Sequence, residues 1–442
     1  MSRRRKQLPD APGEATIESL SHEGRGIAHI DGKIIFIDEA LPGETVRFTY
    51  TGQRSRFAEG AAFEITNPSP DRVDPGCRYF TICGGCSLQH MSPQAQIAHK
   101  QQVLFEQLRH IGGVEPVDTL PPLTGEVWGY RHKARLGVKY VQKKGKVLVG
   151  FREKNKPYIA DIDSCEVLHP VIGKKLVALK ELVNSLQIRS EIPQMEVAVG
   201  DDGAMIVVRH MVDLPPTDRA LLQQFEAEHG IGILLQGNHA ETVLPLAENG
   251  VDRLMYKLDD YGVQMEFTPL DFTQINFRIN RDMIGQVINL LQPEKTDHLL
   301  DLFCGLGNFT LPLARHAAFV TGVEGATRLV EKARLNAVKN AIDNVEFQKA
   351  DLYLPAIAGE FLHRRFDKVL LDPPRSGAQE VIEQMKFTHV HRLVYVSCNP
   401  ATLARDAGLL VKLHGFKLVS AGVMDMFPHT THVESLAVFE KN

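Results

Sequence analysis

Four cysteines have the spacing of a metal-binding group. Cys77, Cys83 and Cys86 form a C-x5-C-x2-C motif, and Cys165 follows after 78 intervening residues. In a chain expected to work in the cytoplasm, cysteines are more often ligands or nucleophiles than disulfide partners. Structural zinc sites usually combine two pairs of ligands, whereas iron–sulfur clusters often use three close cysteines and one remote one. The spacing therefore favours a [4Fe-4S] cluster and leaves zinc as the alternative.

Four acidic residues follow or end successive apolar segments in the last third of the chain. A glycine turn, Cys304–Thr310, follows the first of these segments. Open parallel sheets bind ligands outside the carboxyl ends of their strands, where acids accept hydrogen bonds from ribose hydroxyls. An acidic crevice also suits the sulfonium cation of S-adenosylmethionine better than a pyrophosphate. The pattern predicts a methyltransferase, with a nicotinamide enzyme or an inactive fold as alternatives. The four acids are Asp301, Glu324, Asp351 and Asp372.

A further apolar segment ends at Cys398, within Ser397-Cys398-Asn399-Pro400. Carbon 5 of uracil is a weak nucleophile, but a thiolate that adds to carbon 6 converts the ring to an enolate whose carbon 5 accepts a methyl group. The adduct must then lose its carbon 5 proton to a base, and a carboxylate is suitable. Glu434, which precedes the last apolar segment, is the best candidate. A lone cysteine is usually a packing residue, so this pair depends on its context.

A basic segment runs from Arg131 to Lys156, with ten Lys or Arg residues and one acid, Glu153. It has the pattern of a β-hairpin that turns at residues 143–146, with Tyr130, Tyr140 and Phe151 interleaved. Cations that meet phosphates and aromatic faces that meet bases are typical of nucleic-acid binding. The alternative is a solvated hairpin whose aromatic residues belong to the core. The cations are Arg131, Lys133, Arg135, Lys139, Lys143, Lys144, Lys146, Arg152, Lys154 and Lys156.

The elements that must position these residues fall into three predicted domains, since 442 residues suffice for about three. Residues 1–67 combine a basic tail, Arg3–Lys6, with short strands typical of a small OB-like β-barrel. Residues 68–269 form a central α+β domain that holds the cluster and the hairpin. In residues 270–442 strands and helices alternate, which predicts a Rossmann-like α/β domain with a parallel sheet.

The composition excludes several other classes of protein. Hydrophobic residues make up 43% of the chain and charged residues 24%, as in globular domains, so disorder and coiled coil are excluded. No segment is long and apolar enough to span a membrane. The net charge of −4 conceals the basic segment. We expect a cytoplasmic protein, monomeric and without a membrane partner.

Five motifs together resemble the RNA uracil-5-methyltransferases, and the resemblance covers nearly the whole chain. It implies S-adenosylmethionine contacts from Gln274, Phe303, Asn308, Glu324, Asp351 and Asp372. It also implies that Cys398 is the nucleophile, that Glu434 is the base, and that Cys77, Cys83, Cys86 and Cys165 hold a [4Fe-4S] cluster. The motifs are Phe272-Thr273-Gln274, residues 301–309, Asp372-Pro373-Pro374-Arg375, Ser397-Cys398-Asn399-Pro400 and His432-Val433-Glu434.

The combination of domains indicates a branch of that family. The Gly24-x-Gly26 turn and the later Pro42-Gly43-Glu44 turn resemble the TRAM domain of RNA-modifying enzymes. A chain with both barrel and cluster is similar to the branch that methylates 23S rRNA, whose target base must be flipped out of its stack. The same chemistry on tRNA is the first alternative. A radical enzyme of the methylthiotransferase kind lacks support because its C-x3-C-x2-C signature is missing, and a non-catalytic ribosome assembly factor would not need Cys398 with Glu434.

Overall fold

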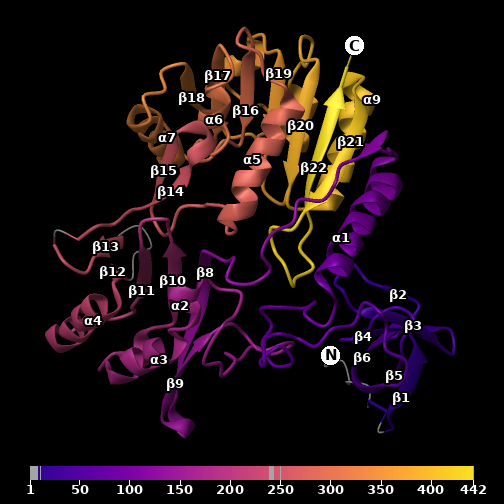
Figure 1. Ribbon diagram of the computed structural model, residues 1–442, viewed down its shortest axis with the longest axis vertical. Coiled ribbons are helices and arrows are strands. Elements are labelled where there is room, and N and C mark those ends of the chain that lie inside the picture. The colour runs from indigo at the N-terminus through magenta and orange to yellow at the C-terminus, as the bar shows by residue number, and fades with distance from the viewer. Residues whose placement is uncertain (1–7, 10, 238–242, 249, 442) are drawn as a thin grey trace. The chain divides into compact units, whose positions relative to one another are not determined.

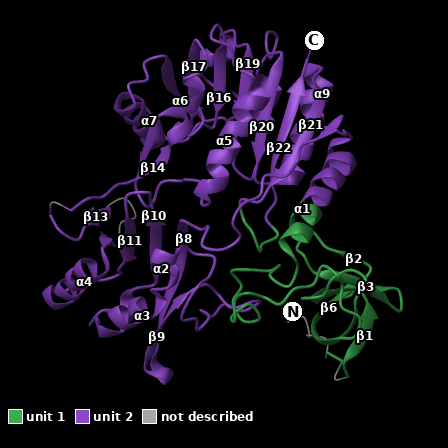
Figure 2. Cartoon of the chain, viewed as in Figure 1, with its two compact units in different colours: residues 1–100, 427–431 green, residues 101–426, 432–442 purple. Residues whose placement is uncertain are grey.

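The structure is a computed structural model that describes residues 8–9, 11–237, 243–248 and 250–441. The chain divides into two compact units, of which the first comprises residues 1–100 and 427–431 and the second residues 101–426 and 432–442 (Figure 2). The expected basic tail, Arg3–Lys6, lies outside the described residues. The three domain boundaries expected from the sequence stay predictions.

The first unit contains a six-stranded sheet (Figure 1). The strand order is β1-β5-β6-β4-β3-β2, and only two residues separate the edge strands β1 and β2 in the chain. Phe48 fills the core, and a Cβ at Gly13 or Gly60 would lie within 2.5 Å of its ring. The strands are β1 Gly13–Thr16, β2 Ser19–Leu20, β3 Gly26–Ile30, β4 Lys33–Asp38, β5 Thr45–Gln53 and β6 Phe57–Ile65.

The rest of the first unit is mostly loop, followed by the start of helix α1, Pro93–Gln107. The loop is anchored to a segment from near the end of the chain. The backbone amides of Ser87 and Leu88 donate to the carbonyl oxygen of His429 at 2.9 and 3.0 Å. The ammonium group of Lys100 donates to the carbonyl oxygen of Phe427 at 2.9 Å. Residues 427–431 therefore belong to this unit despite their position in the sequence.

The second unit begins with a six-stranded sheet of order β13-β12-β11-β10-β8-β9. The expected basic hairpin is confirmed, with β8 Lys133–Val141 and β9 Lys146–Gly150 paired antiparallel around the turn. A second antiparallel hairpin is formed by β10 Gln194–Val199 and β11 Ala204–Arg209. The remaining elements are α2 Pro170–Gly173, α3 Leu176–Ser185, α4 Pro216–His229, β12 Ile231–Gln236, β13 Val243–Pro245 and the separate pair β14 Leu254–Leu258 and β15 Val263–Phe267.

The expected parallel sheet forms the last part of the second unit (Figure 1). Its order is β18-β17-β16-β19-β20-β22-β21-β7, in which β18, β17, β16, β19 and β20 are parallel and β22 is antiparallel to β20. The strands are β7 Asp118–Thr119, β16 His298–Leu302, β17 Phe319–Glu324, β18 Val345–Lys349, β19 Lys368–Leu371, β20 Arg392–Ser397, β21 Lys417–Met424 and β22 Glu434–Glu440. The helices are α5 Phe277–Leu291, α6 Thr310–Ala314, α7 Thr327–Lys339, α8 Gln379–Gln384 and α9 Pro400–His414.

Within the described part of the chain, none of the helices has the length and apolar character that crossing a membrane requires.

Candidate active site

One edge of the parallel sheet gathers the predicted site residues from six neighbouring strands. The parallel strands end there, and the antiparallel β22 begins there, so the start of β22 lies beside the end of β20. This edge is therefore the carboxyl edge of the parallel strands, where open α/β sheets bind their ligands. In spatial order from β18 to β22, the edge carries Asp351, Glu324, Asp301, Asp372, Cys398 and Glu434.

The glycine turn after β16 is built around the carboxylate of Glu324. The backbone amide of Gly305 donates to Oε2 of Glu324 at 3.2 Å, and the amide of Ala326 donates to Oε1 at 2.9 Å. Gly305 and Gly307 have φ values of 55° and 89°, a backbone region that glycine adopts without steric cost. Phe303, with φ 67°, places its ring 5.7 Å from that of Tyr353. The turn thus holds Glu324 and Phe303 at the expected edge.

Two carboxyl groups at this edge have raised pKa values. Burial raises the pKa of Asp301 to about 7, and the nearby charge of Glu324 adds to the effect, although Thr310 donates a hydrogen bond to it at 2.5 Å. Burial raises the pKa of Asp372 to about 8, with Asp301 as a second cause. In the part of the chain that the structure describes, Oδ1 of Asp301 is buried without a hydrogen-bond partner. A ligand cation at this edge would stabilise both ionised carboxylates.

The other expected cofactor residues differ in how firmly they are held. Asn308 exchanges hydrogen bonds with Asn280 at 2.9 and 3.1 Å, and its oxygen accepts the hydroxyl of Tyr256 at 2.8 Å. Asp351 is exposed and follows the end of β18, where its carboxylate accepts the amide of Tyr353 at 3.0 Å. Gln274 lies half-buried in the loop between β15 and α5. Asn308 and Asp351 thus lie in the loops that follow β16 and β18 at the sheet edge, with Asn308 the more constrained, and the role of Gln274 stays a prediction.

Cys398 and Glu434 are neighbours because of strand register. Ser397 pairs with Ser435 in the antiparallel ladder of β20 and β22, so the next residue of one strand faces the preceding residue of the other. Cys398 is half-buried and Glu434 is 7% exposed. Burial raises the pKa of the Cys398 thiol to about 11, and the charges of Glu434 and Asp372 raise it further against the opposing effect of Arg375. The thiol is thus protonated at neutral pH when the site is empty of substrate.

This raised pKa predicts how Cys398 reacts with iodoacetamide. Because only the thiolate is alkylated, the rate at Cys398 should rise about tenfold for each pH unit between 7 and 10. Glu434→Gln removes a negative charge and should lower the pKa of the thiol, so alkylation at pH 8 becomes faster. Mass spectrometry of the peptide that contains Cys398 separates this reaction from that of the other cysteines. An alkylation rate that levels off by pH 8.5 in the unaltered protein would show that the pKa of the Cys398 thiol is not raised.

Asp271 is a positioning residue that the sequence analysis missed. It is 1% exposed, and its carboxylate accepts Arg328 at 2.7 Å and also pairs with Lys332, both on α7. The same carboxylate accepts the backbone amide of Thr268 at 2.7 Å, which closes the loop that carries Gln274. A lone aspartate before an aromatic residue gives no signal in the sequence, because its two cationic partners lie more than fifty residues away.

The expected metal ligands lie in different units. Cys77, Cys83 and Cys86 belong to the loop of the first unit, and Cys165 belongs to the second unit. The backbone amide of Gly85 donates to the sulfur of Cys83 at 3.4 Å, an interaction of the kind that ligating sulfurs accept. Among the described residues, no group of three or more His, Cys, Asp or Glu side chains has the arrangement of a metal site. The cluster therefore stays a prediction.

The aromatic residues expected to face nucleic acid need one correction. Tyr130 is only 5% exposed and belongs to the core, because it precedes β8 rather than lying on its outer face. Tyr140 is half-buried beneath the guanidinium group of Arg189, at 4.9 Å from its ring centre. The structure instead exposes Tyr158, in the loop after the hairpin, at 66%. Sequence analysis missed it because the tyrosine lies beyond the basic segment.

Comparisons with known proteins identify the family and the fold of this chain. The model of the tRNA (uracil-5-)-methyltransferase family matches residues 130–442, and that of the TRAM domain matches residues 13–63. A solved tRNA (uracil-54, C5)-methyltransferase from Pyrococcus abyssi, in complex with S-adenosyl-L-homocysteine, superposes with a TM-score of 0.73 at 24% identity. That likeness covers 97% of this chain and 100% of the other, and it shows a shared fold.

The chain therefore belongs to the RNA uracil-5-methyltransferase family, a class of S-adenosylmethionine-dependent enzymes. Two relatives extend over its full length and share a name, 23S rRNA (uracil(1939)-C(5))-methyltransferase RlmD. The protein from Alkalilimnicola ehrlichii is 52% identical over 100% of this chain and 99% of its own. The protein from Methylococcus capsulatus is 51% identical over 99% of both chains.

Proposed function

We propose that this enzyme methylates carbon 5 of one uridine in 23S rRNA, in the cytoplasm. The observation that carries the proposal is the register of β20 and β22, which brings Cys398 beside Glu434 at the carboxyl edge of the sheet. The full-length relatives named for uracil 1939 of 23S rRNA support the choice of RNA. The TRAM domain and the basic hairpin supply surfaces for RNA beyond the target base.

The two residues divide the reaction between them. The sulfur of Cys398, once deprotonated, forms a bond to carbon 6 of the flipped uracil, and the ring electrons move toward carbon 5. S-adenosylmethionine, when bound, supplies the methyl group that carbon 5 accepts. Glu434 then takes the proton from carbon 5, and the bond between sulfur and carbon 6 breaks as the ring double bond returns. Because the thiol of the free enzyme has a raised pKa, we infer that substrate binding promotes its deprotonation.

The acidic edge carries the hydrogen-bond acceptors and the negative charge that S-adenosylmethionine needs. Glu324 and Asp351 would accept hydrogen bonds from ribose hydroxyls and adenine, and Asp372 would supply a carboxylate that favours the sulfonium cation. The unpartnered oxygen of Asp301 supports a cation or a donor at this edge. We assign Gln274, Phe303, Asn308, Glu324, Asp351 and Asp372 to cofactor binding, with Asp271 holding the loop of Gln274.

The substrate is tested with labelled S-adenosylmethionine and two RNAs side by side. Purified enzyme should transfer label to unmodified 23S rRNA at one uridine, and transfer to unmodified tRNA should be at least about a hundredfold slower. Nuclease mapping of the product identifies the nucleotide. Equal or faster labelling of tRNA would establish tRNA as the substrate for the same chemistry.

We further propose that Cys77, Cys83, Cys86 and Cys165 hold a [4Fe-4S] cluster. The support is the set of four thiols, three of them in one loop, together with the amide that donates to the sulfur of Cys83. Such a group would tie the loop to a distant segment of the chain and thereby stabilise both. It need not take part in redox chemistry.

Metal analysis tests this proposal. Protein purified without oxygen should be brown and should contain about four iron and four sulfide per chain. Cys165→Ser should lose most of the iron and lower the melting temperature, because three remaining ligands hold a cluster poorly. Cys304→Ser, which alters a buried cysteine of the sheet domain, serves as the control and should keep its iron. One zinc per chain with no sulfide would contradict the assignment.

A further inference from the structure

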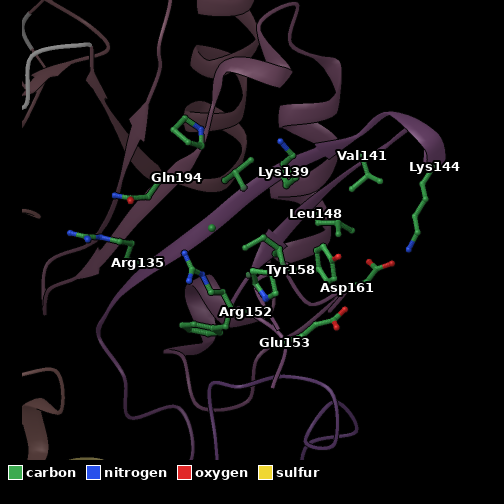
Figure 3. Close-up of a pocket in the computed structure, with 17 residues that line it drawn as sticks. Arg135, Lys139, Val141, Lys144, Leu148, Arg152, Glu153, Tyr158, Asp161 and Gln194 are labelled. Carbon is green, nitrogen blue, oxygen red and sulfur yellow. The ribbon is translucent and has the colours of Figure 1, made fainter. Parts of the chain in front are cut away.

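A pocket of about 720 Å³ lies against the basic hairpin (Figure 3), and none of the sheet-edge residues described above lines it. Its floor is formed by alternate residues of β8, since successive side chains of a strand point to opposite faces. Its walls come from residues 151–153, 157–159 and 161 and from residues 193–194, which include the start of the neighbouring strand. The floor residues of the hairpin are Arg135, Gly137, Lys139, Val141, Leu148 and Gly150.

The two acids that line this pocket are already neutralised by lysines. Asp161 pairs with Lys146 and, at 3.3 Å, with Lys180. Glu153 pairs with Lys156 at 3.2 Å. None of these three lysines lines the pocket. Lysines outside the pocket therefore offset the negative charge of the two acids that line it.

The cations of the pocket are left with a surplus of positive charge. Arg135 pairs with Glu196 at 2.9 Å but remains 68% exposed. Lys139, Lys144 and Arg152 are exposed, and within the described residues they have no ion pair. Figure 3 shows Arg135 and Lys144 toward the two ends of the pocket, with Arg152 between them. This charge distribution favours a ligand with more than one negative group.

An exposed aromatic ring is held in the wall of the same pocket. The amide of Glu153 donates to the carbonyl oxygen of Tyr158 at 2.8 Å, and the amide of Ala160 donates to that of Phe151 at 2.8 Å. The loop also packs closely on β8, since a Cβ at Gly137 would lie 2.3 Å from the side chain of Ile159. Tyr158 is thus fixed by the backbone on either side while 66% of it stays exposed.

We propose that this pocket binds one unpaired nucleotide of the substrate RNA, other than the uridine that is methylated. The base stacks on Tyr158, and Lys139, Lys144 and Arg152 contact the phosphates on its two sides. Apolar residues in the floor, an exposed aromatic ring and cations without an ion pair among the described residues are together typical of sites that bind single-stranded nucleic acid. An acidic peptide would leave the ring without a stacking partner. The inference rests on the proposed function, because the RNA is the substrate.

Binding measurements at several salt concentrations separate stacking from charge. The probe is a 23S rRNA fragment that contains the uridine named in the relatives. Tyr158→Ala should weaken binding about tenfold at every salt concentration, with the salt slope unchanged, because stacking releases no counterions. Tyr158→Phe keeps the ring and should bind within about twofold of the unaltered enzyme. Lys139→Gln with Arg152→Gln should instead flatten the slope by about one to two units.

Leu413→Ala, at an exposed position of α9, is the control and should change neither affinity nor slope. Ultraviolet crosslinking should attach a nucleotide to the peptide that contains Tyr158. Tyr158→Ala that binds and methylates the RNA as well as the unaltered enzyme would overturn the pocket and leave the proposed function intact. The pocket proposal would also be overturned if polyglutamate displaced the RNA as effectively as a single-stranded oligonucleotide does. Failure of the unaltered enzyme to methylate any RNA would reject both proposals.

Discussion

Cys398→Ala should abolish methylation and the covalent complex with RNA together. Without the sulfur, carbon 6 of uracil has no partner and carbon 5 does not become nucleophilic, so the rate should fall by at least about 10⁴. The half-buried site should tolerate the smaller side chain, and RNA and S-adenosylmethionine should still bind.

Steady-state transfer of labelled methyl groups measures the loss of methylation, and denaturing gels measure the loss of the covalent protein–RNA complex. Cys304→Ala is the matched control, because this other cysteine of the sheet domain is buried, at the first residue of the glycine turn. It should keep the covalent complex and most of the rate. Residual adduct formation in Cys398→Ala would assign the nucleophile to another residue.

Glu434→Gln should have a different effect, since the role that we propose for Glu434 begins after the methyl group has been accepted. Addition and methyl transfer remain possible, but removal of the carbon 5 proton should slow by about 10² to 10⁴. A methylated protein–RNA complex should then accumulate and survive denaturation. Pre-steady-state measurements should show one rapid methyl transfer per enzyme, followed by slow release.

The control for this variant is Glu440→Gln, at the opposite end of the same strand, where the side chain pairs with Arg392. That substitution should leave turnover close to normal. Normal turnover of Glu434→Gln, or its failure before methyl transfer, would show that another group removes the proton.

Local sequence patterns were sufficient to predict much of the architecture. The apolar segment that ends at Glu324 coincides with β17, and the glycine at position 145 lies in the turn of the basic hairpin, with φ 61°. The alternation of strands and helices after residue 270 predicted the parallel sheet and hence the shared edge. These features depend on neighbours in the chain, which is why a single sequence reveals them.

The remaining features depend on contacts between distant segments. Cys398 faces Glu434 only because β22 inserts antiparallel beside β20, an order that strand patterns do not encode. Asp271 becomes a positioning residue only when α7 brings Arg328 and Lys332 to it. The burial of Tyr130 and the exposure of Tyr158 likewise follow from how the loop packs on the hairpin.

RNA that carries 5-fluorouridine at the target position tests the central claim most directly, because a fluorine at carbon 5 cannot be removed as a proton. Unaltered enzyme, this RNA and S-adenosylmethionine should form a stable complex. Digestion and mass spectrometry should show the methylated fluorouridine attached to the sulfur of Cys398. A complex attached to any other residue, or methylated product released without a covalent complex, would contradict the mechanism proposed for this site.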